Sequence, residues 1–519
     1  MTVISDLIKE VRPFSRRGLL ERIANVAATL DKEPRRIQML KWPKVVRGTR
    51  LRDIDVLLAT HNLEALTKLV LAHGNKWSNK LPEFGDIVRL QNHVENLPSR
   101  FTEEPTGTVS IEEMMFQLIC QQFPFQSRNE KRALARVHIL YKRIPELLEQ
   151  DGFSLPFDLE EEFQRITGMS LTQFICSGIW LFGLATQSRK FKLGDLENQT
   201  EKIRAIWSIP ESDLPTQQSM ESVLNRVSFE LDDFANHIGN LNEHDERLIA
   251  YDYQPLLEYP LVHLGNDEYI CPIPKLLLDR FTIGVFHDLA NAMRCPGREN
   301  PFREYFGKLY ERYVGLQLSL VFGNSDIHPE VQYERGQKST SDWTVSHTVT
   351  NLAIECRTST FIIETRKGGD IENITRDLTR IGAETIKDLP PKIESLHAGV
   401  TLVALVTPRP TKAVLCTFES LEPIALFGTL LSETAKKIAG DFGEFHLVTI
   451  DYLEDMCATE DPSKFMDALA ALKVDDTWAD ISTADPKPAW ESAMPEPMRQ
   501  NTILEEAARY LLDVDVRPA

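Results

Sequence analysis

The chain lacks the short motifs that mark several common classes of enzyme. It contains no G-x-x-x-x-G-K-[ST] loop and no G-x-G-x-x-G turn, so a nucleotide-binding site of either kind is not indicated. It contains no G-x-S-x-G sequence either, which excludes the nucleophile elbow of the α/β-hydrolases. His61, His93 and His138 are isolated, and they are better explained as packing or surface residues than as metal ligands.

The chain also has few cysteines and no long apolar run. None of its seven cysteines has a partner at C-x-x-C spacing, so neither a structural zinc site nor a disulfide framework is indicated, and a reducing cytoplasm is expected. The most apolar window, Leu171–Ala185, is too short for a bilayer and predicts a buried helix. Asp6 and Glu10 interrupt the first apolar residues, which argues against a signal peptide. We therefore expect a cytoplasmic protein that does not enter a membrane.

Acidic residues outnumber basic ones, 77 to 58, and the formal net charge of −19 argues against indiscriminate binding to polyanions. The charge is uneven along the chain. Residues 1–50 hold twelve Lys or Arg against five Asp or Glu, whereas residues 451–519 hold six against sixteen. Two interpretations stay open: both ends are solvated surfaces, or the basic beginning faces phosphate.

Patterning predicts four segments. Residues 1–225 are expected to be a mostly helical domain for sensing or binding, with Asn129–Gln150 as a clear example of helical spacing. Residues 226–299 are expected to form a connector with a small hairpin, and residues 300–455 an α/β domain. Residues 456–519 form an acidic segment with a terminal helix, which is expected to dock on the protein or to bind a partner.

Within residues 300–455 the order helix, three strands, helix, strand predicts an α/β domain with a mixed sheet. The second helix is expected to close before Pro390-Pro391. The predicted elements are helix Pro301–Phe322, strand Ile327–Tyr333, two strands within Ser341–Arg357, helix Gly369–Leu389, a buried strand at Gly399–Thr407, a further helix, and the strand FHLVTIDYL.

The stretch SDWTVSHTVTNLAIECR, residues 341–357, predicts a hairpin with acids at its open end. If the turn centres between Thr348 and Val349, Asp342 faces Glu355 across the two strands. Thr344, Ala353 and Arg357 share the face of these acids, and the opposite face is wholly apolar (Trp343, Val345, Leu352, Ile354, Cys356). Facing carboxylates repel one another. A divalent cation, Mg²⁺ or Mn²⁺, held by Asp342 and Glu355 at the open rim of the sheet would remove that repulsion.

Four short segments, FGKLYERYVG, PEVQY, SDWTV and IECR, resemble the PD-(D/E)XK nuclease superfamily in order and spacing. The resemblance covers about residues 300–455 and implies a restriction-endonuclease-like fold. It places Glu311 at the helix acid, Asp342 and Glu355 at the strand acids, and Arg357 where lysine is usual. It implies metal-dependent endonuclease action on nucleic acid, DNA first, and bacterial proteins with such a module often serve in antiviral defence.

Arg357 departs from the family pattern. An arginine stays protonated and cannot act as a general base, although it can bind a phosphate. Lys338 or Lys367 is close enough in sequence to reach the site instead. The segment RKGGD, residues 366–370, is explained either as a plain helix start or as a phosphate contact.

Ordinary structural roles stay open for each site residue. Glu311 can pair with Lys308 or Arg312 on a helix surface, Asp342 can cap a strand start, and Glu355 can pair with Arg357. The alternatives to a nuclease are a degenerate module that binds nucleic acid or supports assembly, and a scaffold whose helical half and acidic tail bind a protein partner.

Overall fold

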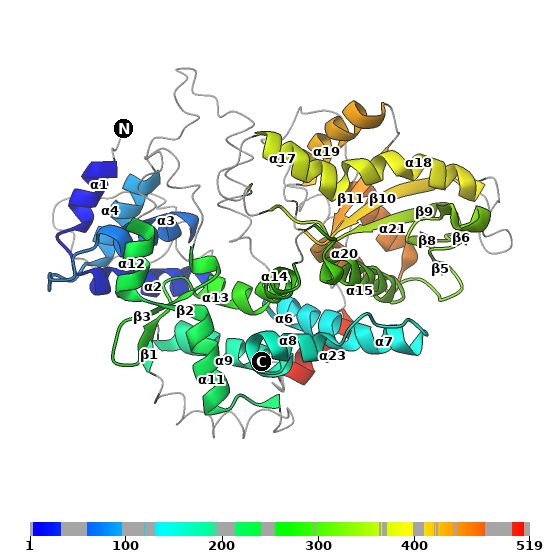
Figure 1. The fold of residues 1–519 in the computed structure, drawn as a ribbon. Coiled ribbons are helices and arrows are strands. Elements are labelled where there is room, and N and C mark those ends of the chain that lie inside the picture. Colours follow the sequence, from blue (N-terminus) through cyan, green and yellow to red (C-terminus); the bar gives the residue numbers. More distant parts are fainter. Residues whose placement is uncertain are drawn as a thin grey trace, which may run out of the picture.

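The computed structural model describes residues 4–32, 60–95, 119, 130–188, 190–192, 194, 213–239, 255–294, 297–362, 365, 371–397, 409–419, 421, 424–440, 444–472 and 501–512. Within these residues the protein is an α/β protein with one four-stranded sheet, one five-stranded mixed sheet and many helices. Figure 1 shows the first helices on one side of the molecule and the five-stranded sheet on the other, with a helical layer between and below them.

The first helices share one apolar core with part of a small sheet. Residues such as Leu7, Leu20 and Leu66 in the helices pack with Val262 and Ile270 in two strands. The helices of this group are α1 (Ile4–Val11), α2 (Arg16–Lys32), α3 (Thr60–His73), α4 (Phe84–Glu95) and α12 (Leu231–Gly239). The predicted helical character of the first segment is therefore confirmed for its described residues.

The small sheet has the strand order β1-β4-β3-β2. Its strands are β1 (Lys190–Lys192), β2 (Ser228–Glu230), β3 (Leu261–His263) and β4 (Glu268–Ile270). β3 and β4 are antiparallel, so the predicted hairpin is confirmed. Its turn needs positive φ at Gly265, Asn266 and Asp267, which glycine and asparagine-type residues tolerate best. The predicted division of the chain at residues 225, 299 and 455 stays a prediction.

The helical layer beneath the five-stranded sheet begins with the predicted helix at Asn129–Gln150. It is one continuous run of α6 (Glu130–His138), a π turn η4 (Ile139–Arg143) and α7 (Ile144–Gln150). The other helices of the layer are α8 (Leu159–Thr167), α9 (Leu171–Ser188), α11 (Gln217–Val227), the 3-10 turn η8 (Pro255–Leu257), α13 (Pro274–Phe281) and α14 (Ile283–Ala292). α9 is the predicted buried helix, and its packing is close enough that a Cβ at Gly178 would lie 2.1 Å from the Phe281 ring.

No single helix among the described residues is long and apolar enough to cross a bilayer; α8 and α9 pass that test only as a pair, and they are bent by 58°.

The five-stranded sheet has the order β11-β10-β9-β8-β5 and is mixed, as predicted. β9, β10 and β11 are parallel, whereas β8 is antiparallel to both β5 and β9. Its strands are β5 (Ile327–Pro329), β8 (Trp343–Val345), β9 (Asn351–Arg357), β10 (Thr411–Thr417) and β11 (Phe445–Thr449). A separate ribbon of β6 (Gln332–Tyr333) and β7 (Lys338–Ser339), with the 3-10 turn η9 (Glu334–Gly336) between them, extends beside it.

Three strand predictions need correction or lie outside the described residues. Ile327–Tyr333 is not one strand, because β5 ends at Pro329 and β6 pairs elsewhere. FHLVTIDYL is a strand only as far as Thr449, after which a helix begins. β10 was not predicted, and the strand predicted at residues 399–407 lies outside the described residues.

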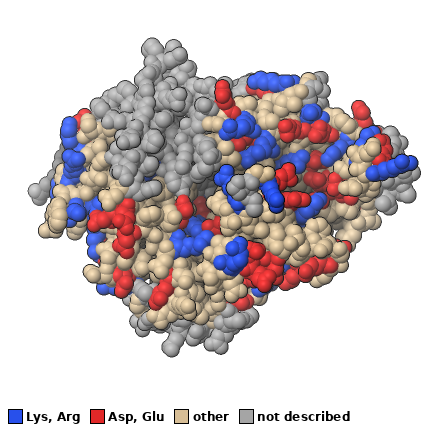
Figure 2. Space-filling view, in the orientation of Figure 1, with Lys and Arg blue, Asp and Glu red and all other residues tan. Residues whose placement is uncertain are grey.

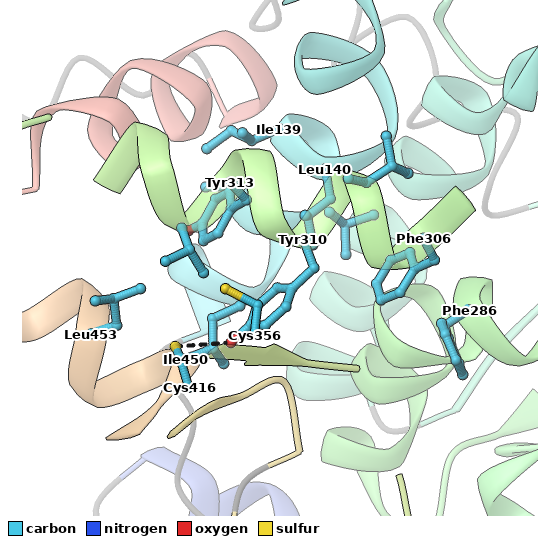
Figure 3. Close-up of a cluster of buried hydrophobic side chains, with 14 of the residues drawn as sticks. Ile139, Leu140, Phe286, Phe306, Tyr310, Tyr313, Cys356, Cys416, Ile450 and Leu453 are labelled. Atoms are coloured by element: carbon cyan, nitrogen blue, oxygen red, sulfur yellow. Dashed lines mark hydrogen bonds between the residues drawn. The ribbon is translucent and has the colours of Figure 1, made fainter. Parts of the chain in front are cut away.

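Helices cover both faces of the five-stranded sheet. α15 (Pro301–Leu318), the predicted first helix of this domain, lies against the apolar face together with α20 (Ile450–Met456) and α21 (Pro462–Ala471). Figure 3 shows Tyr310 and Tyr313 of α15 pointing toward this face, where the Tyr310 hydroxyl lies 3.3 Å from the Cys416 sulfur. A small apolar cavity of about 10 Å³ lies there, lined by Ile354, Val414, Cys416 and neighbouring apolar side chains.

The opposite face is covered by α17 (Ile371–Leu378), a π turn η10 (Thr379–Ala383), α18 (Glu384–His397) and α19 (Ile424–Ala439). The prediction that a helix closes before Pro390-Pro391 is wrong, because α18 runs through both prolines to His397. The apolar stripe of Ile386, Leu389 and Leu396 stays buried along it, and this packing outweighs the loss of two backbone donors. Beyond the prolines, the Tyr333 hydroxyl donates to Ser395 Oγ at 2.6 Å.

A buried ionic cluster joins the helical layer to the sheet domain. Arg136 of α6 donates to Glu454 of α20 from Nε at 2.6 Å and from Nη2 at 2.7 Å, and it also contacts Asp451. The Tyr313 hydroxyl donates to Glu454 Oε1 at 2.6 Å. The terminal helix α23 (Thr502–Leu512) packs on α6, and Asn501 before it donates to the Glu454 carbonyl. The expected docking of this helix is confirmed.

Candidate active site

The predicted hairpin register is confirmed. Trp343 pairs with Ile354, Thr344 with Ala353 and Val345 with Leu352. Continued by one residue, this register sets Asp342 opposite Glu355. In an antiparallel pair, opposed Cβ atoms lie about 4.5–5.5 Å apart. The two acids that the sequence paired therefore lie at one end of the strands, on the face covered by α18.

Asp342 ends the ladder between β8 and β9. Its Oδ2 accepts the backbone N–H of Cys356 at 2.7 Å, a bond that a strand carbonyl would otherwise make. The proposed capping role of Asp342 is thus observed. Among the described residues no hydrogen-bond donor contacts its second oxygen, Oδ1, so one carboxylate oxygen stays available to a ligand.

Glu355 is not at an open rim, and that expectation is wrong. Its residue is 2% exposed, because α18 covers the acidic face that the hairpin was expected to leave open. The carboxylate is not surrounded by apolar groups alone. Lys392 Nζ of α18 donates to Glu355 Oε1 at 2.5 Å, and Arg357 Nη2 lies 4.0 Å from Oε2.

Glu311 lies one helical turn from Lys308 on α15, and the two form an ion pair at 2.7 Å. This is the surface pairing foreseen for it; Arg312 instead pairs with Asp151, at 2.9 Å. Glu311 is nevertheless tied to the strand acids, because its carbonyl accepts Nε1–H of Trp343, the neighbour of Asp342, at 2.7 Å. Burial raises the pKa of Glu311, and the charges of Asp342 and Glu330 add to that rise.

The two strand acids oppose each other's ionisation. Burial, followed by the Asp342 carboxylate, raises the pKa of Glu355 to about 7, although Lys392 and Arg357 lower it. Burial also raises the pKa of Asp342, against the effect of the Cys356 N–H and the same two cations. An added positive charge between the acids would let both ionise, which is the effect a bound cation has on such a pair.

The residues fit a cation only as a two-carboxylate site. Within the described part of the chain, no three His, Cys, Asp or Glu side chains are grouped closely enough to hold a metal ion. Asp342 Oδ1 and Glu355 Oε2 are the oxygens not engaged by Cys356 and Lys392. Magnesium sites of this kind use one or two carboxylates and complete the octahedron with water and phosphate oxygens.

Arg357 occupies the end of β9, and its side chain is 40% exposed. It donates from Nε to the Thr385 hydroxyl at the start of α18, which aligns the guanidinium beside Glu355 while leaving part of it in solvent. The foreseen pairing of Glu355 with Arg357 is present but long, at 4.0 Å. A half-exposed guanidinium next to two acids is suited to holding a phosphate oxygen.

Lys392 is the site residue that sequence reasoning missed. Lys338 pairs with Glu334 at 2.9 Å on the exposed ribbon, and Lys367 lies outside the described residues. Lys392 went unnoticed because α18 was expected to end before it. The signal that could have found it is the helical spacing of Ile386, Leu389 and Leu396, which continues across the two prolines.

No family model, curated protein or solved structure matches this chain. The assignment of a role to the site therefore rests on its own geometry and on the sequence resemblance.

Proposed function

We propose that this protein is a metal-dependent nuclease of restriction-endonuclease-like fold that hydrolyses phosphodiester bonds in nucleic acid. We expect DNA to be the substrate. The observation that carries the proposal is the pairing of Asp342 with Glu355 across β8 and β9, with Lys392 and Arg357 beside them. A buried acid, Glu355, directly opposed by the half-buried Asp342 costs stability, and such an arrangement is typical of functional sites. A role in bacterial defence follows from the resemblance alone.

Each side chain has a task that its position allows. Asp342 and Glu355 would hold Mg²⁺ or Mn²⁺, which supplies an activated water and stabilises charge on the scissile phosphate. Lys392 keeps Glu355 oriented through its contact with Oε1, and its ammonium can orient a water next to the two acids. Arg357 would bind a phosphate oxygen and stabilise the negative charge that develops in the transition state. The backbone carbonyl of Glu311 holds the Trp343 indole next to Asp342, whereas the Glu311 side chain pairs with Lys308.

The second candidate is a degenerate module that binds nucleic acid without cutting it. Two observations favour it: no three-ligand group is present in the described residues, and Glu355 already has a lysine partner. A scaffold that binds a protein partner through the helical region is the third candidate.

Cleavage assays separate these candidates. Purified protein would be incubated with plasmid DNA and with RNA in the presence of Mg²⁺, Mn²⁺ or EDTA. The proposal expects cleavage that needs the metal and is lost in Asp342→Asn and Glu355→Gln. Glu372→Gln is a suitable control, because it removes an exposed acid from α17 and leaves the residues of the candidate active site unchanged.

Lys392 and Arg357 give a finer test. Lys392→Met is expected to lower the rate of cleavage by about 10²-fold or more, since orienting or acid–base groups contribute on that scale. Arg357→Lys is expected to retain cleavage. Metal-independent binding with no cleavage would support the degenerate module, and cleavage that survives Asp342→Asn would refute the assignment of this site.

A further inference from the structure

Three arginines from different elements gather beside the candidate active site. They are Arg294, just after α14, Arg303 in the first turns of α15, and Arg380 in η10. Figure 2 shows Lys and Arg side chains over the region between α14 and α17 on this face, interrupted by acids. In a chain with a formal net charge of −19, a local group of three arginines of which only Arg380 has a carboxylate partner among the described residues needs an explanation.

A network of aromatic rings fixes where this arginine cluster lies relative to the site. The N–H of Phe418 donates to the carbonyl of Arg357, at the end of β9, at 2.8 Å. The Phe418 ring packs against Phe286 of α14, with centroids 6.1 Å apart, and the guanidinium of Arg303 lies over that same Phe286 ring at 5.5 Å. Arg303 is thus held two aromatic contacts away from Arg357.

Arg380 lies at the same edge of the sheet. It donates to the carbonyl of Thr360, three residues after Arg357, and to Asp377 at 3.0 Å. Arg294 is brought close by Asn300, the N-cap of α15, whose amide donates to the carbonyl of Ala290 at 2.6 Å. The ends of α14, α15 and η10 therefore converge near the carboxyl ends of the parallel strands β9 and β10, where α/β proteins commonly bind ligands.

The charges within the cluster are only partly neutralised. Arg380 has Asp377 as a partner, but no carboxylate in the described part of the chain lies within ion-pair distance of Arg294 or Arg303. Burial lowers the pKa of Arg303, and the neighbouring guanidiniums of Arg380 and Arg294 lower it further. The repulsion among these guanidiniums is relieved when an anion binds between them.

We infer that Arg294, Arg303 and Arg380 form a phosphate-backbone contact that positions nucleic acid across the candidate active site. This inference rests on the proposed function for its substrate class, a phosphodiester polyanion. The guanidiniums contact phosphate oxygens one or more nucleotides away from the bond that lies at Asp342 and Glu355. Such contacts set the register of the strand without reading its sequence.

The test is binding in EDTA, where no metal-dependent cleavage occurs. Fluorescence anisotropy of a short fluorescein-labelled DNA duplex would be measured at several salt concentrations with wild type and with Arg294→Gln/Arg303→Gln. Arg380 is left in place, because it also supports the Thr360 loop. The double variant is expected to bind about tenfold more weakly or worse. Its salt slope should fall by about 0.9 for each phosphate contact removed.

Two further variants keep the result interpretable. Arg89→Gln/Arg165→Gln removes the same charge from exposed arginines that already pair with acids, and it should bind like wild type. Arg294→Lys/Arg303→Lys keeps the charge and should retain most of the salt slope. Circular dichroism would show that all variants are folded.

The outcomes distinguish this inference from the proposed function. If the wild type binds DNA through the arginines but never cleaves it, the inferred phosphate contact is supported and the proposed nuclease function is refuted. If the wild type cleaves DNA and Arg294→Gln/Arg303→Gln binds as tightly as wild type, the inferred phosphate contact is refuted and the proposed nuclease function is not affected. A wild type that does not bind the duplex, or equal weakening by the two double Gln variants, would also overturn the cluster.

Discussion

Two groups of buried acids in this protein receive very different compensation. Glu454, which is fully buried, accepts two bonds from Arg136 and one from Tyr313, so both of its oxygens are satisfied. Glu355 is nearly as buried, but it faces a second acid and has one close cation, Lys392. The first group is built to hold helices to the sheet. In the second, burial and the neighbouring Asp342 raise the pKa of Glu355 to about 7, and a bound cation would favour its ionisation. This is the reason for proposing the function there.

Removing Arg136 is expected to have the largest effect on stability. Arg136→Met leaves Glu454 buried without its cation, and breaking such a pair costs about 3–5 kcal/mol of unfolding free energy. Urea denaturation would measure the loss. Arg136→Met/Glu454→Leu removes both charges and should recover much of it. If the single variant were as stable as wild type, the contrast between the two groups would be lost.

A Glu→Gln substitution is expected to change the free energy of unfolding in opposite directions in the two groups. Glu454→Gln should destabilise, since it weakens the partner of a buried guanidinium. Glu355→Gln should stabilise the metal-free protein at pH 8. The pKa of Glu355 is about 7 in the fold against an ordinary value of 4.5, so its carboxyl favours folding below pH 4.5, and that contribution disappears as the pH rises through 7.

The size of this pH effect is about 3 kcal/mol between the two limits. Thermal unfolding in EDTA at a series of pH values would show it as a decline in stability from pH 4.5 to above 7 that Glu355→Gln reduces. Equal pH profiles for the variant and wild type would contradict a raised pKa of Glu355 in the folded protein.

Packing behind the site gives a smaller effect with an internal control. A Cβ at Gly315 of α15 would lie 2.1 Å from the Trp343 ring, so Gly315→Ala should displace the strand that carries Asp342. Overpacking of this kind costs about 1–3 kcal/mol. Gly307 lies in the same helix with nothing within 4 Å, and Gly307→Ala should instead stabilise by about 0.5–1 kcal/mol through helix propensity. Thermal unfolding of the pair would test whether α15 sets the position of β8.

Lys392→Met is expected to have the smallest effect on stability. At pH 6, below its pKa of about 7, the Glu355 carboxyl is already mostly protonated, so removal of Lys392 should cost at most about 1 kcal/mol, the scale of one hydrogen bond. Chemical denaturation at pH 6 would measure it beside Arg136→Met. A loss as large as that of Arg136→Met would mean that Lys392 is structural in the same sense.

Local patterning was enough to predict the hairpin and the face on which its acids lie. Alternation of apolar and polar residues over Trp343–Cys356 defines the register, because a slip by one residue would bury the polar set against α15. The period of apolar residues in Asn129–Gln150 likewise defines a helix wherever it packs. Such predictions succeed because each depends on neighbours within a few residues.

Two features depended on contacts that sequence patterning does not contain. α18 continues through Pro390-Pro391 because its buried stripe packs on the sheet, a gain that a local rule about proline omits. That continuation covers Glu355 and brings Lys392 to it from 37 residues away. The arginine cluster is also tertiary, since Arg294, Arg303 and Arg380 meet only when α14, α15 and η10 converge.

The sequence by itself determined the mixed α/β character, the pairing of Asp342 with Glu355 and the presence of Arg357 at the end of their strand. The tertiary structure decided how buried these acids are, which lysine serves them and which cations surround them. The physical reason is range: strand alternation is set between adjacent residues, whereas burial and charge balance are set by whatever elements the whole chain packs around them.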